Sequence, residues 1–271
     1  MRTPAWLRNL NLSAPPFAKS IDDKDLWLPT SRKEVVDELV EALHERQHAL
    51  VVGDPGVGKT CTLRALRRRL PNSGFRLTYC HNTTLGRRDF YRQICMTLNL
   101  PTKATAASVF FELQKHVETL AGEKTHPVFM LDEAQLMQDQ VLRHLHVLAN
   151  FEWDSEPLMS LVLVGLPELW RRLCVGVHRS LWSRIHCRIA LEPASPEDTN
   201  EYVAHRLALV GGKLSVFSSD ALSMLHESTL GQLRDIDRLA TTSLRAAGRR
   251  KLKTVDRDLM QDVLDNDSLP D

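Results

Sequence analysis

The stretch VVGDPGVGKTCTLRAL, residues 51–66, constrains the fold of this 271-residue chain more than any other part of its sequence. Two valines lead into the pattern G-x-x-x-x-G-K-[ST], with Gly53, Gly58, Lys59 and Thr60 at its fixed positions. Glycines in such a loop let successive backbone N–H groups turn inward, and the start of the following helix adds positive potential. The stretch therefore predicts a strand, a phosphate-binding loop and a helix, in that order.

The side chains of this loop indicate which phosphates it binds. The ammonium of Lys59 can reach the outer phosphates of a nucleotide, and the hydroxyl of Thr60 can ligate Mg²⁺. The alternative is a glycine-rich turn without a ligand, which the flanking strand and helix disfavour. We therefore expect ATP with Mg²⁺ to bind here. The residues expected to contact the nucleotide are Gly53, Asp54, Pro55, Gly56, Val57, Gly58, Lys59, Thr60 and Cys61.

A second motif, PVFMLDEAQ at residues 127–135, supports the first. It reads as a buried strand that ends in the adjacent carboxylates Asp132 and Glu133. Asp132 is expected to hold Mg²⁺ through its water shell, beside Thr60. Glu133 is expected to orient and deprotonate the water that attacks the γ-phosphate. A pair of acidic residues at a strand end is usually just solvated, but downstream of a phosphate loop it predicts a Walker B site. Together the two motifs predict a site competent for hydrolysis, with Lys59 and Glu133 as catalytic residues.

Short apolar runs alternate with helical segments over the first two thirds of the chain. This alternation favours a parallel sheet covered by helices on both faces, an α/β three-layer sandwich. A helix with one apolar face is expected over residues 31–47, capped by Ser31. The expected strands are 49–53, 75–80, 127–132, 160–165 and 187–191.

The strand signal stops near residue 195, and four consecutive helices follow in the pattern. We expect them within residues 195–212, 218–229, 231–250 and 254–267. Several begin at Ser, Thr or Asp, which favours helix starts. The predicted organisation is an N-terminal arm at 1–25, a nucleotide-binding α/β domain at 26–193, a small all-α lid at 194–266 and a polar tail at 267–271.

Composition bounds the function without deciding it. The formal net charge is +1, so contact with nucleic acid would need a local basic patch. The N-terminus lacks the apolar core of a signal peptide, the longest apolar run is too short to span a bilayer, and the five cysteines are scattered. These features fit a cytoplasmic protein. The spacing of Cys174, His178, His186 and Cys187 matches no usual zinc pattern.

The order of the motifs resembles that of the AAA+ ATPases, over roughly residues 25 to 265. One strand separates the two nucleotide motifs, and a helical domain follows the fifth strand. The resemblance implies that Arg184, in WSRIHCRIAL, reaches the γ-phosphate bound in a neighbouring subunit and acts in catalysis. It also implies that Arg234, in GQLRDIDRL, senses the nucleotide of its own subunit, with Arg238 as the fallback.

Two further positions are expected from the same resemblance. AAA+ proteins place a polar side chain, sensor 1, at the end of the fourth strand, where this chain has Gly165 and Leu166. Either Ser160 or a backbone group takes its place, or the coupling of hydrolysis is altered. Asn82, after the second strand, is a candidate to restrain Glu133.

Several shorter motifs are similar to the ExeA-like branch of AAA+ proteins, which contains the transposon ATPases TniB and TnsC and, more distantly, MuB. They are Asp-Glu-Ala-Gln at 132–135, Asn-Phe-Glu at 150–152, Gly-x-Pro-Glu-Leu at 165–169 and Tyr-x-x-x-Arg-Leu at 202–207. The chain departs from the family at Leu166, where glutamine is frequent. The resemblance implies a regulator of transposition that forms a homo-oligomeric ring or filament on duplex DNA. Its further partners would be a transposase and a target-selection adaptor.

The expected DNA contacts follow the second strand. Thr83, Arg87, Arg88 and Lys103 would touch phosphates without reading bases, which gives salt-sensitive binding. A solvated helix face explains each of these side chains about as well, and a basic run at 248–253 is an alternative contact. Two other functions stay open: an ATP-driven switch that acts on protein partners without DNA, and a nucleotide-stabilised scaffold with little turnover.

Overall fold

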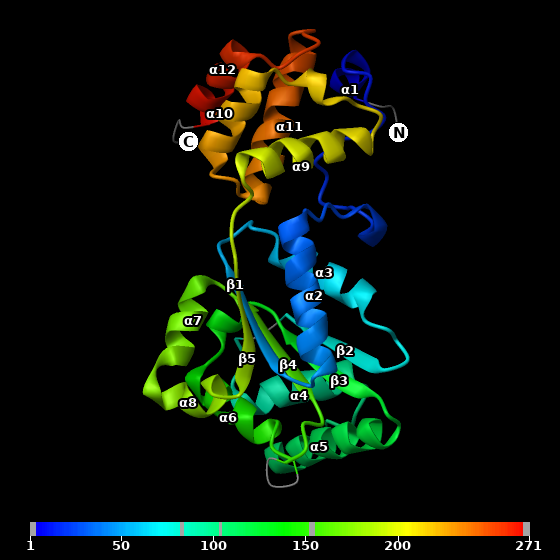
Figure 1. Ribbon diagram of the computed structural model, residues 1–271, viewed down its shortest axis with the longest axis vertical. Helices are drawn as coiled ribbons and strands as arrows, with labels where there is room; N and C mark the ends of the chain where they lie inside the picture. The colour runs from blue at the N-terminus through cyan, green and yellow to red at the C-terminus, as the bar shows by residue number, and fades with distance from the viewer. Residues whose placement is uncertain (1–3, 82–83, 103–104, 152–154, 268–271) are drawn as a thin grey trace. The chain divides into compact units, whose positions relative to one another are not determined.

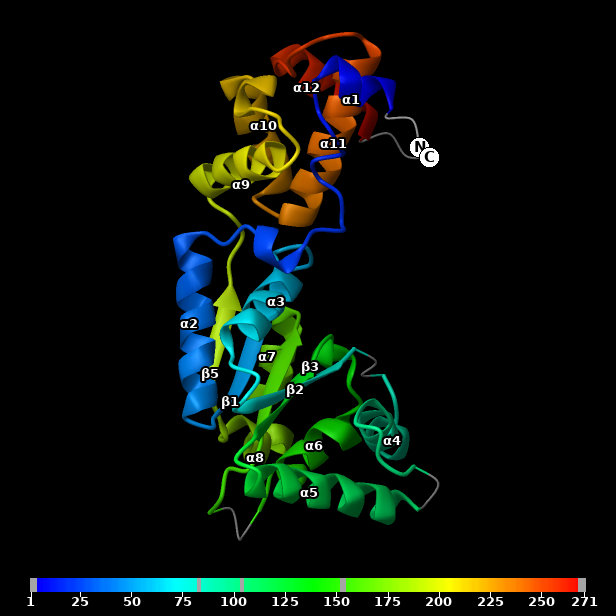
Figure 2. The same cartoon turned by 90° about the vertical axis from the view of Figure 1, so that its right-hand side faces the viewer.

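The computed structural model of the protein describes residues 4–81, 84–102, 105–151 and 155–267. Two compact units divide the chain. One contains residues 30–54 and 59–191, and the other contains 1–29, 55–58 and 192–271. Figures 1 and 2 show the sheet of the first unit and the helices of the second.

A five-stranded parallel sheet forms the centre of the first unit, with strand order β2-β3-β4-β1-β5. The fold predicted from the sequence is confirmed, and each strand lies within two residues of its expected bounds. The central strands are buried along their whole length, as runs without polar alternation predict. The strands are β1 His48–Gly53, β2 Phe75–Cys80, β3 His126–Leu131, β4 Ser160–Gly165 and β5 Ile185–Leu191.

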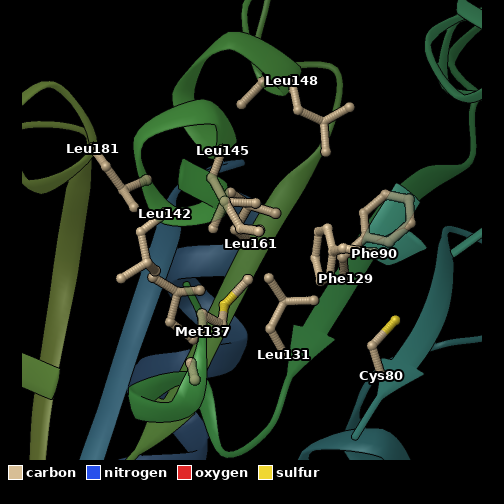
Figure 3. Close-up of a cluster of buried hydrophobic side chains, with 14 of the residues drawn as sticks. Cys80, Phe90, Phe129, Leu131, Met137, Leu142, Leu145, Leu148, Leu161 and Leu181 are labelled. Atoms are coloured by element: carbon tan, nitrogen blue, oxygen red, sulfur yellow. The ribbon is translucent and has the colours of Figure 1, made fainter. Parts of the chain in front are cut away.

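Helices cover both faces of this sheet. On one face, Leu50, Phe129 and Leu161 belong to a single buried cluster that Figure 3 shows in part. The helices that add side chains to this cluster are α4 Arg87–Thr97, α5 Ala106–Gly122, α6 Asp139–Leu148, α7 Pro167–Cys174 and α8 Arg179–Trp182. The buried leucines of α2 and α3 lie outside this cluster, and these two helices pack together on the other face.

The first helix of this unit differs from its prediction in one detail. Helix α2 spans Thr30–His44, so Ser31 is its second residue and the prediction that Ser31 caps it is wrong. The helix begins directly after Pro29. Proline disfavours helical backbone at the residue before it, so the helix does not extend toward the N-terminus past this position. Helix α3, Lys59–Arg69, begins inside the phosphate-loop motif, as predicted.

The second unit contains the four helices predicted after residue 195. Ser195 caps the first, with Asp198 N–H donating to its Oγ over 3.0 Å, and Ser218 caps the second. Gly231, before the third, has φ +73, and a Cβ there would lie 2.0 Å from the carbonyl oxygen of Ala194. The helices are α9 Pro196–Ala208, α10 Ser219–Thr229, α11 Leu233–Arg249 and α12 Arg257–Asp267.

The N-terminal segment belongs to this helical unit, which differs from the arm expected from the sequence. Helix α1, Ala5–Asn9, packs along α11, and Figures 1 and 2 show the two side by side. The N–H groups of Arg206 donate to the carbonyls of Pro16 over 2.8 Å and Ala18 over 2.7 Å. The apolar side chains that the segment adds to the core are Leu7, Leu10, Leu12 and Phe17.

Candidate nucleotide-binding site

The loop between β1 and α3 adopts the backbone that its glycines predict. Gly56 and Gly58 have φ of +85 and +103, a region that residues with a side chain rarely adopt. Lys59, the first residue of α3, is buried, and its Nζ donates to the carbonyls of Gly53 over 2.7 Å and Asp54 over 3.0 Å. Thr60 beside it is exposed. The ammonium is thus held at the end of β1 by neutral oxygens, which the charged oxygens of a phosphate can replace.

Asp132 lies directly after β3 and is only 7% exposed. Its Oδ1 accepts from the backbone N–H of Glu133 over 2.9 Å, and its Oδ2 accepts from the hydroxyl of Tyr79 over 2.6 Å. The carboxylate is therefore fixed in orientation at the carboxyl edge of the sheet.

Tyr79 is a residue that the sequence analysis missed. It lies in β2, one residue before the strand ends, and its ring stacks on His81. Burial, reinforced by the hydrogen bond to Asp132, raises the pKa of Tyr79 well above its usual range. The hydroxyl consequently stays a donor to Asp132 at ordinary pH. The available signal was that the second strand of a parallel sheet ends at the same edge as the Asp-Glu motif.

Glu133 follows in the left-handed backbone region, with φ 52, and its side chain is exposed. One of its oxygens, Oε2, accepts from Nε2 of Gln135 over 2.7 Å. Oε1 of the same glutamine accepts from the backbone N–H of Leu166 over 3.2 Å. The structure therefore brings a residue of the Asp-Glu-Ala-Gln motif between Glu133 and the end of β4.

Ser160 does not occupy the sensor 1 position. It is the first residue of β4, so it lies at the opposite end of the strand from Gly165. Its hydroxyl is 2.8 Å from Nε2 of the buried His126, and burial lowers the pKa of His126 to about 4. The alternative that Ser160 substitutes for the sensor side chain is wrong, because the strand separates the two positions.

Arg184 lies in the turn between α8 and β5. Its side chain is half-buried and donates to the carbonyl of Ser180 over 2.8 Å. In the helical unit, Arg234 is the second residue of α11 and its side chain is exposed. Its backbone N–H donates to the carbonyl of Gly56, which belongs to the same unit, over 3.3 Å. Arg238 follows one turn later, and its Nε lies 3.7 Å from Oδ1 of Asp235.

Two of the residues predicted to contact DNA are described. Arg87 and Arg88 are exposed in the first turn of α4, where they line a surface depression of about 610 Å³ with Tyr91 and His144. Tyr91 is itself buried in the core. Thr83, Lys103 and Asn82 lie outside the described residues.

In the described ranges, no group of three or more His, Cys, Asp or Glu side chains could hold a metal ion, and the five cysteines are unbridged. No helix in the described part of the chain has the length and apolar character to cross a bilayer.

The model of the AAA domain family matches residues 27–173, which is more than half of the chain and includes both nucleotide motifs. The chain belongs to the AAA domain family. This AAA chain is also 33% identical over 239 residues to general secretion pathway protein A of Aeromonas hydrophila. That match covers 87% of this chain and 44% of the relative, so the chain spans less than half of the relative's length. The likeness agrees with the ExeA-like resemblance of the sequence motifs.

Solved structures of other AAA proteins share the fold. The Drosophila ORC bound to DNA matches with a TM-score of 0.71 and 20% identity, covering 98% of this chain and 67% of that one. ORC1 of Aeropyrum pernix in complex with DNA gives 0.65 and 18%, covering 89% and 66%. The RuvB Holliday junction branch migration motor of Thermotoga maritima gives 0.61 and 17%, covering 93% and 73%. At these identities the likeness establishes the fold.

Proposed function

We propose that this AAA protein hydrolyses ATP with Mg²⁺ and that hydrolysis switches an assembly of its subunits. The observation that carries the proposal is the position of Lys59, Asp132 and Glu133. Lys59 follows the carboxyl end of β1, and the two carboxylates follow the carboxyl end of β3, at the same edge of the parallel sheet. A nucleoside triphosphate with Mg²⁺ requires a cation for its phosphates, a carboxylate for the metal ion and a carboxylate for the attacking water. The buried ammonium, the oriented carboxylate and the exposed carboxylate match these three requirements.

Each residue has a separate task in this proposal. Lys59 neutralises the outer phosphates, and the backbone of the loop cradles them. The hydroxyl of Thr60 and the carboxylate of Asp132 would hold Mg²⁺, the latter through water, and the ion would offset charge on the phosphates. Glu133 orients the attacking water and accepts its proton, for which its exposed side chain is suited.

We assign two arginines to the coupling of hydrolysis with assembly. Arg184 acts across the interface on the nucleotide of a neighbouring subunit, where a guanidinium offsets charge developing in the transition state. Arg234 senses the nucleotide within its own subunit, since its helix begins beside the loop residue Gly56. A ring or filament follows, because the arginine of each subunit completes the site of the next.

The finer proposal is that the assembly forms on duplex DNA and regulates transposition, with a transposase and a target-selection adaptor as partners. The exposed Arg87 and Arg88 support a sequence-tolerant phosphate contact. The fold is also shared with proteins whose structures were solved on DNA.

A second candidate is a switch that acts on protein partners. The observation in its favour is the 33% identity to a general secretion pathway protein, over most of this chain. In this case hydrolysis would be indifferent to DNA and would respond to a protein partner. A third candidate is a scaffold with little turnover, which predicts that Glu133→Gln leaves the lifetime of the assembly unchanged.

The test is ATP hydrolysis with and without long duplex DNA, at low and moderate salt, with assembly followed by light scattering. The transposition proposal predicts stimulation by DNA that weakens steeply with salt. It also predicts that Arg184→Ala loses ATP-dependent assembly. The exposed Lys213→Ala in the helical unit serves as a control that keeps both. Hydrolysis that ignores DNA at every salt concentration would overturn the DNA proposal and favour the protein-partner switch.

A further inference from the structure

The side chain of Gln135 connects two parts of the site that lie on different strands. It is the second residue of a 3₁₀ turn, Ala134–Leu136, and is only 8% exposed. Its Nε2 donates to Glu133 over 2.7 Å, and its Oε1 accepts from the N–H of Leu166 over 3.2 Å. One buried carboxamide thus joins the carboxylate after β3 to the backbone at the end of β4.

The polarity of these two contacts fixes the orientation of the amide. A backbone N–H can only donate, so the group that faces Leu166 must be the amide oxygen. An ionised carboxylate can only accept, so the group that faces Glu133 must be the amide nitrogen. Both requirements are met by one rotamer, and flipping the amide would break both contacts at once.

Gly165 supplies the space that this arrangement needs. A Cβ added there would lie 2.6 Å from Oε1 of Gln135, 3.0 Å from Cδ2 of Leu169 and 3.3 Å from the backbone nitrogen of Gln135. The leucine methyl is the end of a flexible side chain and can shift, whereas Oε1 is held in its hydrogen bond. A side chain at position 165 and the observed position of Gln135 therefore exclude each other.

The turn that carries Gln135 is held from a third element. Arg172, in α7, donates to the backbone carbonyls of Gln135 and Met137, the latter over 2.9 Å, and to Asp139 over 2.6 Å. The two carbonyl contacts hold the backbone of the turn, and the third ties the guanidinium to the first residue of α6. The amide of Gln135 is consequently presented to Glu133 from a rigid base.

We propose that Gln135 is the positioning residue that links Glu133 to the end of β4, in place of a polar side chain on β4 itself. The proposal rests on the proposed hydrolysis of ATP at this site and names how its base is oriented. Gln135 acts through Glu133, because its donated hydrogen bond fixes Oε2 of that carboxylate. A shift of the β4 end changes this hydrogen bond through Leu166, which gives the site a path by which β4 controls hydrolysis.

The experiment compares three single variants in the full chain, and Gln135→Ala with and without Gly165→Ala as a double-variant test. Gln135→Met keeps the length of the side chain and removes both hydrogen bonds. Gly165→Ala leaves Gln135 in the sequence but takes its place in space. Gln140→Ala is the matched control, an exposed glutamine nearby whose Nε2 donates to Gln138. ATP affinity, the number of binding-competent sites and turnover per site are measured for each, with the unfolding temperature.

Both test variants should lower kcat per binding site by about 10- to 100-fold, since a small misplacement of a reacting group costs this much. The affinity for ATP should change by less than about 2-fold. The lost hydrogen bond orients Glu133 toward the attacking water and does not contact the bound nucleotide. Adding Gly165→Ala to Gln135→Ala should cost less than about 2-fold further, because the two changes remove the same contact. The control Gln140→Ala should match the wild type.

The contrary outcomes separate the two proposals. Wild-type turnover per site in Gln135→Met would overturn the role of Gln135 and leave ATP hydrolysis intact. A fall in ATP affinity in step with kcat, or a full additional loss in the double variant, would make Gln135 merely structural and would also overturn it. A wild-type protein that binds ATP but does not hydrolyse it would overturn the proposed function, and this inference with it.

Discussion

At the residue scale, Asp132 has both carboxylate oxygens engaged before any ion is bound, by the N–H of Glu133 and the hydroxyl of Tyr79. A partner that orients a metal-binding side chain tunes metal affinity, and its loss typically costs about 10- to 100-fold. Under the Mg²⁺ role proposed for Asp132, Tyr79 is such a partner, because its hydroxyl donates to Oδ2.

Tyr79→Phe is expected to weaken the response to Mg²⁺. The ring and its stacking on His81 are kept, and only the hydrogen bond to Asp132 is lost. The Mg²⁺ concentration that gives half-maximal ATP hydrolysis should rise by about 10-fold or more. A titration of hydrolysis with Mg²⁺ at saturating ATP measures this. A curve that coincides with the wild type would show that Tyr79 has no part in orienting Asp132.

Asp237 makes the stability of the helical unit depend on pH. Burial raises the pKa of Asp237 to about 6, although the Tyr202 hydroxyl and the nearby Arg206 act in the opposite direction. Because the folded pKa lies above the unfolded value of 3.8, folding takes up a proton between about pH 4 and 6. The carboxyl therefore costs stability as the pH rises through that window.

Asp237→Asn should remove this dependence. Relative to the variant, the wild type should lose up to about 3 kcal/mol of unfolding free energy between pH 4 and pH 7. The amide keeps an acceptor for the Tyr202 hydroxyl, so the contact that orients that ring survives. Urea unfolding of both proteins across this range gives the difference. Two curves that run parallel in pH would contradict the raised pKa.

The sequence allows residues within one short motif to be proposed for the site. It does not reveal residues that reach the site only because the fold brings distant segments together. Lys59, Asp132 and Glu133 follow from local patterns, since their roles depend on a few consecutive residues at a strand end. Tyr79 is 53 positions from Asp132, and Gln135 is 31 positions from Leu166. No short pattern records such contacts, so the role proposed for Gln135 could be inferred only after the strands were placed.

At the element scale, the same contrast separates the strands from the N-terminal segment. The strands were predicted because each is a run of apolar residues long enough to cross the sheet. Residues 1–25 were predicted to form an arm because they carry prolines and little periodicity. Leu7, Leu10, Leu12 and Phe17 of this segment nevertheless lie in the core of the helical unit, and Arg206 binds the backbone carbonyls on either side of Phe17.

This anchor explains the Tyr-x-x-x-Arg-Leu motif of α9. Arg206 is 6% exposed and reaches Pro16, Ala18 and the hydroxyl of Tyr202, 3.0 Å away. A planar guanidinium spreads its N–H donors over three nitrogens and can reach all three groups at once. The donors of an ammonium all leave a single nitrogen, so they cannot span the same groups. The motif is therefore a fastening for the N-terminal segment.

Arg206→Ala should cost about 3 kcal/mol of unfolding free energy, as expected for the loss of buried charged hydrogen bonds. It should also speed cleavage by trypsin at the exposed Arg8 and Lys19 of the segment. Arg206→Lys should recover little of either property, and the exposed Lys213→Ala should retain both. Equal cleavage rates in Arg206→Ala and the wild type would show that the segment is held by its apolar residues alone.

At the scale of the whole molecule, the sheet unit carries Lys59, Asp132 and Glu133, and the helical unit carries Arg234 together with the loop residues 55–58. The change from strands to helices near residue 195 was predicted because the strand signal ends where four helix-forming segments begin. The general secretion pathway protein extends well beyond the region that matches this chain. The partners of the proposed assembly are therefore identified by experiment and not by this likeness.

The central claim is that Glu133 activates water for hydrolysis of a nucleotide that Lys59 and Asp132 hold. The most direct measurement is ATP binding and turnover in the wild type, Glu133→Gln and Lys59→Ala, side by side. Glu133→Gln should bind ATP with wild-type affinity and lose at least about 100-fold in turnover, because only the proton acceptor is removed. Lys59→Ala should lose binding. Wild-type turnover in Glu133→Gln would contradict the account.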